Sequence, residues 1–149
     1  MLTIKTQNLV KRALKAMENE SPKYYGAFTC ADAAKNHCLL KLSDSEKEKF
    51  LVIFLNSQHE LIKSEIMFHG TIDSASVYPR EIVKRALELN AKAIIISHNH
   101  PSGISTPSQA DKSITRRIKN SCELLDINLL DHIVVGGSNT SSLAQEGLI

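Results

Sequence analysis

The chain has 149 residues, of which 42% are hydrophobic and 23% charged, with a formal net charge of +2. This length suits one domain whose core needs no disulfides, and no segment has the roughly 20 apolar residues of a membrane span. The near-neutral charge gives no support to nucleic-acid binding. Three widely spaced cysteines argue against a disulfide framework or a thiolate zinc site. Because the amino terminus also lacks a secretory signal, we expect a cytoplasmic protein.

Residues 1–42 are expected to form a short helical extension, and residues 43–149 one domain. The apolar residues of the first helix repeat at helical spacing: Leu9, Val10, Ala13, Leu14 and Met17. Residues 18–23, with Ser-Pro inside them, are predicted to be a linker. A second helix is expected to follow Thr29 as its N-cap and to run to about Leu42.

Beyond residue 42 the pattern alternates between strands and helices. Apolar runs predict strands over residues 50–55, 61–71, 93–96 and 129–135, the first two joined as a hairpin. A helix is expected to begin at Pro79 and end at Asn90, burying Ile82, Val83, Ala86, Leu87 and Leu89. The order of these elements predicts an α/β sandwich around one sheet.

The last predicted helix follows a loop rich in Gly, Ser and Pro. Thr106, Pro107 and Gln109 fit its N-cap, N1 and N3 positions in a capping box. Its expected buried stripe is Ala110, Ile114, Ile118, Cys122 and Leu125. This helix matters because its first turn carries two polar residues, Ser108 and Asp111.

Two histidines stand where the strand predicted over 93–96 ends. Residues two apart in an extended chain point to the same side, so His98 and His100 present two imidazoles together. Ser108 and Asp111 share a face in the first turn of the next helix. If the loop folds that helix over the strand end, the imidazoles and the carboxylate converge. Three N/O ligands and one water make a catalytic zinc site, so the sequence predicts zinc held by His98, His100 and Asp111.

The spacing of these residues resembles the JAMM motif of JAB/MPN-type zinc metallopeptidases. The string His98-Asn99-His100-Pro101-Ser102-Gly103, with Ser108 and Asp111, is similar to the bacterial RadC family in particular, and to its short stand-alone members. The resemblance implies a cytidine-deaminase-like mixed sheet sandwiched by helices. It also implies zinc-dependent hydrolysis of a peptide or isopeptide bond in a peptide or protein substrate. Glu48 would then shuttle protons, and Ser108 would hydrogen-bond the oxyanion.

Several alternatives stay open. Glu46 and Glu65 compete with Glu48, which lies in a charged run that could be a solvated face. His132 is expected to be a hydrogen-bonded or core residue behind the ligands, and we assign Asn99 a similar supporting role. The traditional label of the RadC family suggests a DNA-repair-associated accessory protein instead, and an inactive metal-bound scaffold is a third hypothesis. Zincins and nucleobase deaminases are disfavoured because their motifs are absent from the sequence.

Overall fold

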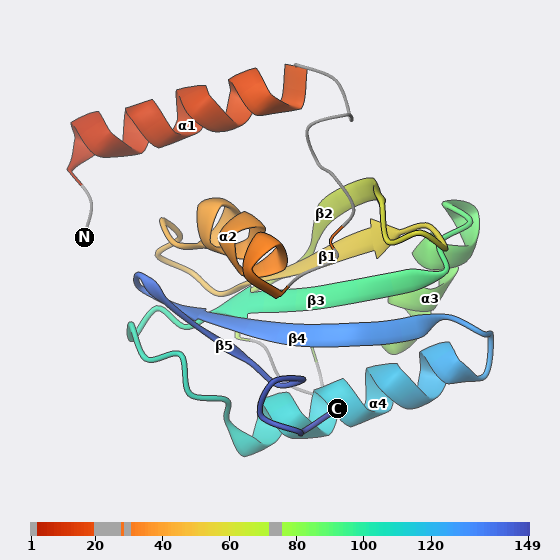
Figure 1. The fold of residues 1–149 in the computed structure, drawn as a ribbon. Helices are drawn as coiled ribbons and strands as arrows, with labels where there is room; N and C mark the ends of the chain where they lie inside the picture. The colour runs from red at the N-terminus through yellow and green to blue at the C-terminus, as the bar shows by residue number, and fades with distance from the viewer. Residues whose placement is uncertain (1–2, 20–27, 29–30, 72–75) are drawn as a thin grey trace.

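A computed structural model of the chain describes residues 3–19, 28, 31–71 and 76–149. Its elements are, in order, α1 (Ile4–Asn19), α2 (Ala31–Leu42), β1 (Lys49–Leu55), β2 (Leu61–His69), α3 (Pro79–Glu88), β3 (Ala93–Asn99), α4 (Gln109–Glu123), β4 (Asn128–Gly136) and β5 (Asn139–Ser142). The five strands form one sheet in the order β2-β1-β3-β4-β5 (Figure 1). Only β3 and β4 pair in parallel; the other neighbours are antiparallel.

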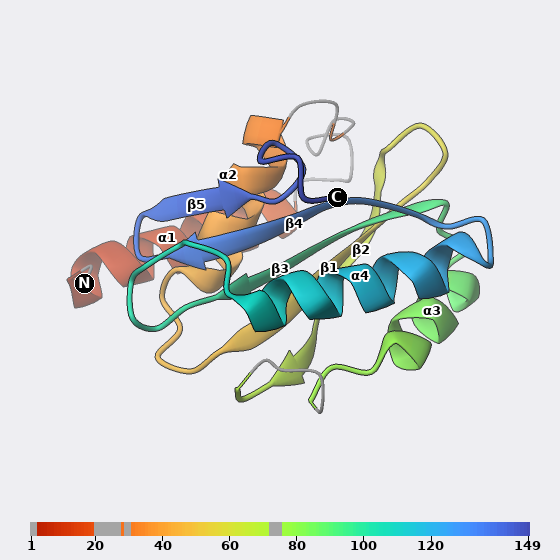
Figure 2. The same cartoon turned by 90° about the horizontal axis from the view of Figure 1, so that it is seen from below.

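Helices cover both faces of this sheet. Helix α2 lies on one face, and α3 and α4 lie on the other, as the two views show (Figures 1 and 2). Because both faces are covered, β1 and β3 are buried along almost their whole length, which explains their unbroken apolar runs. The structure thus confirms the predicted α/β fold with a mixed sheet between helices.

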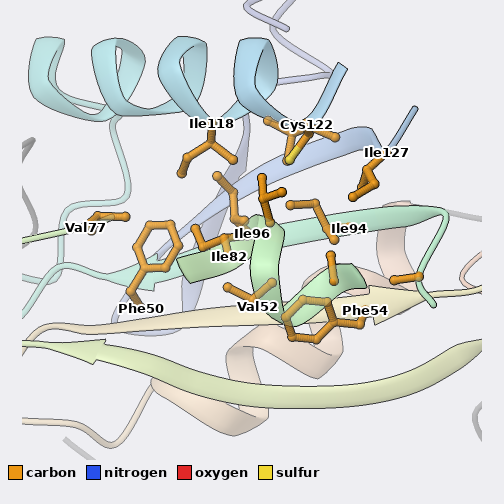
Figure 3. Close-up of a cluster of buried hydrophobic side chains, with 14 of the residues drawn as sticks. Phe50, Val52, Phe54, Val77, Ile82, Ile94, Ile96, Ile118, Cys122 and Ile127 are labelled. Atoms are coloured by element: carbon orange, nitrogen blue, oxygen red, sulfur yellow. The ribbon is translucent and has the colours of Figure 1, made fainter. Parts of the chain in front are cut away.

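The larger hydrophobic cluster packs α3 and α4 against the sheet (Figure 3). Its members from the two helices are Ile82, Val83, Ala86, Ile114, Ile118 and Cys122, and those from β1 and β3 include Phe50, Val52, Phe54, Ile94 and Ile96. Each large side chain fully buried there contributes about 1.5–3 kcal/mol. This packing fixes the first turn of α4 relative to the end of β3, where the candidate ligands lie.

The buried faces of α3 and α4 differ in part from the predicted stripes. Ala110 is exposed, and so are Leu87 and Leu125. On α4 the buried positions instead include Asp111 and Thr115. Apolar side chains at the edge of a stripe stay in solvent when no second element covers them, and periodicity alone does not say where the neighbouring element ends.

Helix α4 begins later than the sequence indicated. Its N-cap is Ser108, not Thr106. The Ser108 hydroxyl accepts a hydrogen bond from the backbone N–H of Asp111, and the Asp111 carboxylate accepts one from the backbone N–H of Ser108. Ser and Asp at these positions therefore form the capping box that we had assigned to Thr106 and Gln109.

The strand boundaries also shift. Strand β3 extends to Asn99, so His98 lies inside the strand and His100 directly after it. Strand β2 ends at His69, two residues early, whereas β4 matches its prediction to within one residue. The sequence did not predict β5, because Asn139–Ser142 has no apolar residue and is a strand only through pairing with β4.

The amino-terminal segment is helical, as expected. Helix α1 includes residues 18 and 19, the first two of the predicted linker, while the rest of that linker and Thr29 lie outside the described residues. Helix α2 ends at Leu42 as predicted, and its Ala34, Cys38 and Leu42 pack on the sheet. The division at residue 42 stays a prediction. Among the described residues, no helix is both long and apolar enough to cross a membrane.

Candidate metal centre

The side chains of His98, His100 and Asp111 converge at the end of β3. Their potential ligand atoms all lie within 4.8 Å of one another. The two Nε2 atoms are 2.9 Å apart, His98 Nε2 is 3.1 Å from Asp111 Oδ1, and His100 Nε2 is 3.3 Å from Asp111 Oδ2. The side chains of His98 and Asp111 are 1% and 3% exposed and that of His100 is 16% exposed, so solvent reaches the cluster from the His100 side.

The Nδ1 atom of His100 is 2.8 Å from the carbonyl oxygen of Ile104. A carbonyl only accepts, so Nδ1 carries the proton, and the Nε2 of the neutral ring is left with a free lone pair. The backbone of His100 is also fixed, because its N–H donates to the carbonyl of Val135 on β4. His100 is therefore oriented with Nε2 toward His98 and Asp111.

The capping box of α4 orients Asp111. Ser108 N–H donates to Oδ2 at 2.7 Å, which leaves Oδ1 directed at His98. Burial by itself raises the pKa of this carboxyl, but a protonated His98 ring donates to it and, together with the Ser108 hydrogen bonds, holds the pKa well below its ordinary value. A bound metal would replace the proton that His98 Nε2 carries in that form. Asp111 is therefore a carboxylate, as a metal ligand must be.

The three side chains fit a divalent cation such as zinc. A tetrahedral zinc with Zn–N distances of about 2.0–2.1 Å holds its ligand atoms about 3.3 Å apart. The two Nε2 atoms are 2.9 Å apart, and they lie 3.1 and 3.3 Å from different oxygens of the Asp111 carboxylate, so each pair is near that value. Two imidazole nitrogens and one carboxylate are also the N/O donor set that zinc uses in catalytic sites, where a fourth position stays open.

Of the two supporting residues that the sequence predicted, His132 lies directly beside the cluster. The Nε2 of His132 on β4 is 2.8 Å from His98 Nδ1, and its ring is fully buried. Burial, and then the neighbouring imidazole of His98, hold the pKa of His132 well below its ordinary value, so the ring is neutral. His132 thus contacts His98 on the side opposite to Asp111.

Asn99 joins the end of β3 to the segment before β1. Its side-chain oxygen accepts from the Lys49 N–H, and its amide donates to the carbonyls of Ser45 and Lys47. This segment carries Glu48. In the β1–β3 register, Phe50 pairs with His98, so Glu48 and His100 each lie two residues beyond this pair, just outside the paired strands. Glu48 is half-buried.

The two competing glutamates lie elsewhere. Glu65 on β2 accepts three hydrogen bonds from Arg85 of α3 and pairs with Lys63. The Arg85 hydrogen bonds lower the pKa of the Glu65 carboxyl, so Glu65 is a charged partner in an ion pair. Glu46 is exposed in the loop before β1. The Asn99 hydrogen bonds to Lys49 and Lys47, on either side of Glu48, therefore favour Glu48 among the three.

One residue that the sequence reasoning did not single out shapes the loop after His100. A Cβ atom at Gly136, the last residue of β4, would come within 2.4 Å of the Ser105 nitrogen and 2.5 Å of the Ile104 carbonyl carbon. The loop can therefore lie against β4 only because residue 136 has no side chain. The Gly136-Gly137 pair was visible in the sequence, but only the tertiary structure shows what lies against it.

A groove of about 980 Å³ opens next to the cluster. It lies between the end of the sheet, α1, the end of α2 and the loop after it, and its lining includes Val10, Leu39, Leu42, Asn99, His100 and Gly136. A groove of this size accommodates a peptide segment. His100 lies both in the cluster and in the groove wall.

The structure is an α/β domain with a mixed sheet between helices and three candidate metal ligands at one strand end. The family model of the RadC-like JAB domain matches residues 28–148. The chain therefore belongs to the RadC family, as the sequence motif indicated.

Individual relatives agree with this assignment. The chain is 46% identical to UPF0758 protein YfjY of Escherichia coli K12, covering all of this chain and 93% of that one. It is 43% identical to UPF0758 protein YkfG of the same strain, covering 99% and 94%. A UPF0758 protein of Pseudoalteromonas translucida is 53% identical over 82% of this chain, which spans 54% of that longer relative. The names of these three relatives state no activity.

Proposed function

We propose that this protein is a zinc-dependent hydrolase that cleaves a peptide or isopeptide bond. The observation that carries the proposal is the convergence of His98, His100 and Asp111 within 4.8 Å at a site where the His100 side chain is partly exposed to solvent. Membership of the JAB-domain family supports the same reaction class.

The chemistry divides between the metal and the chain. Zinc bound by His98, His100 and Asp111 would supply a Lewis acid and a water whose pKa lies near 7. Glu48 would accept the proton of the attacking water and return it to the leaving amine. The Asn99 hydrogen bonds to the backbone on either side of Glu48 hold its segment next to the end of β3, which supports this role.

Ser108 would stabilise the oxyanion that forms at the attacked carbonyl. Its Oγ already accepts from the Asp111 N–H, so its own hydroxyl proton stays available for donation. Ser108 is exposed next to a buried ligand, which suits a group that meets a substrate. A peptide or protein is the proposed substrate, because the groove beside His100 is large enough for a chain segment.

The first measurement is the metal content. Purified protein is expected to hold one zinc per chain, and His98→Ala with His100→Ala is expected to hold none. The zinc-loaded protein is then incubated with a mixture of linear and isopeptide-linked peptides in H₂¹⁸O, and mass spectrometry detects new carboxyl groups carrying the label. Intact peptides after prolonged incubation with zinc-loaded protein, across both linkage types, would contradict the proposal.

Glu48→Gln separates an enzyme from an inactive scaffold. It should keep zinc and the fold but lower the cleavage rate about 10²–10⁴-fold, the usual contribution of general acid–base catalysis. Glu46→Gln is the matched control, since it removes a carboxylate from the same loop and should leave the rate unchanged. Equal rates for both variants would exclude Glu48 as the proton shuttle.

A further inference from the structure

A chain of three buried hydrogen bonds runs behind the candidate metal centre. The Oγ1 of Thr115 on α4 is 2.5 Å from the backbone carbonyl oxygen of Asp111 and 2.6 Å from His132 Nδ1. The Nε2 of His132 is 2.8 Å from His98 Nδ1. Thr115, His132 and His98 are each at most 2% exposed, so water does not compete for these bonds.

The direction of each bond follows from which atoms carry protons. The carbonyl of Asp111 only accepts, so the single hydroxyl proton of Thr115 lies in that bond. Thr115 Oγ1 must then accept from His132, which places a proton on His132 Nδ1. Full burial disfavours a charged imidazole ring, so His132 Nε2 is unprotonated and accepts from His98 Nδ1–H.

The last bond determines the state of His98. With the proton on Nδ1, Nε2 of the neutral ring has its lone pair free. That Nε2 is the atom 3.1 Å from Asp111 Oδ1 and 2.9 Å from His100 Nε2. A free imidazole can carry its proton on either nitrogen, and only one of these tautomers can bind a metal at this position.

We propose that Thr115 and His132 form a positioning relay that holds His98 in the tautomer able to bind a metal through Nε2. The relay starts at the backbone of Asp111, passes from α4 through β4 to β3, and ends on His98. It therefore links two ligands that come from different elements. The inference rests on the proposed metal site but requires no particular substrate.

Four variants test the relay by zinc affinity, measured by competition with a chromophoric chelator. Thr115→Val keeps the shape but removes the only acceptor for His132 Nδ1–H, and should weaken zinc binding about tenfold or more, as changes behind metal ligands do. Thr115→Ser keeps the hydroxyl and should bind zinc like the wild type. His132→Gln, whose carbonyl can still accept from His98, should lose less affinity than His132→Leu.

Ser121→Ala is the control for the loss of a side-chain hydrogen bond to the backbone of α4. Ser121 donates to the Arg117 carbonyl four residues back on α4, as Thr115 does to Asp111, but away from the cluster. It should lower stability slightly and leave zinc affinity unchanged. If Thr115→Val binds zinc as tightly as this control, the relay is overturned.

Long-range ¹H–¹⁵N NMR spectra of the histidine rings provide a readout independent of activity. The zinc-bound wild type should show protonated Nδ1 and coordinated Nε2 in His98, with His132 protonated at Nδ1. Coordination of His98 through Nδ1, or absence of zinc binding altogether, would overturn the relay. Zinc binding with the expected tautomers but without hydrolysis would contradict only the proposed function. Hydrolysis by the wild type, together with an unchanged zinc affinity in Thr115→Val, would contradict only the relay.

Discussion

At the end of β3, each candidate ligand also makes a hydrogen bond to a residue outside the cluster: His98 to His132, His100 to Ile104, and Asp111 to Ser108. Helix α1 lies apart from the sheet, beyond α2 (Figure 1). Its Ile4 and Leu9 are 77% and 65% exposed, and it meets the rest of the molecule through contacts such as that of Gln7 with Asp44.

The two regions show that an amphipathic pattern can specify a helix without specifying the surface against which the helix packs. The apolar repeat of α1 predicts the helix, but of its described side chains Leu9 and Ala13 are exposed and Val10 is half-buried. The first turn of α4 is fixed instead by the buried residues further along the same helix, Ile114 and Ile118, and by the capping box at Ser108. We therefore expect changes near the cluster to affect metal binding strongly and changes in α1 to affect it little.

The largest effect is expected at Asp111. Asp111→Asn removes the only anionic candidate ligand and should weaken zinc binding more than about 100-fold, beyond the range typical of residues behind the ligands. Chelator competition measures this. An affinity within tenfold of the wild type would show that the carboxylate is not a ligand.

The same variant tests the lowered pKa of Asp111 in metal-free protein. Because the folded pKa is below the unfolded value of about 3.9, the ionised carboxyl stabilises the fold above about pH 4, and this stability is lost as the pH falls through the folded pKa. The difference in unfolding free energy between wild type and Asp111→Asn should therefore shrink between pH 6 and pH 3. Urea unfolding across that range measures it, and a constant difference would contradict the pKa direction.

An intermediate effect is expected at Gly136. A methyl group there must push away the backbone at Ile104 and Ser105, and with it the carbonyl that orients His100. Gly136→Ala should weaken zinc binding about 10-fold, as loss of a partner behind a ligand does. An unchanged affinity in a folded variant would show that His100 needs no support from this loop.

The smallest effect is expected from deleting residues 1–19. Zinc affinity should not change, and the unfolding free energy should change by less than about 0.5 kcal/mol, as at surface positions without special contacts. Cleavage of a substrate could still change through Val10, which lines the groove. A marked loss of zinc binding would remove the contrast between the two regions.

Much of the fold could be predicted from local pattern. The apolar runs of β1 and β3 and the Pro79 start of α3 were read correctly, because burial on both faces and the N1 preference of proline leave a local trace. The N-cap of α4 was misplaced by two residues, since Thr106 and Ser108 both fit the local rule. Only the buried position of Asp111 selects Ser108.

The sequence by itself determined the identity of the three candidate ligands, because His98, His100 and Asp111 occur at a spacing that few chains share. The tertiary structure decided what surrounds them: the pairing of His132 with His98, the pairing of Phe50 with His98 in the sheet, and the approach of a loop to Gly136. These features join β1, β3, β4 and the loop before α4, which are far apart in the chain. Contacts of that kind depend on packing between elements, and the local periodicity of a sequence does not encode it.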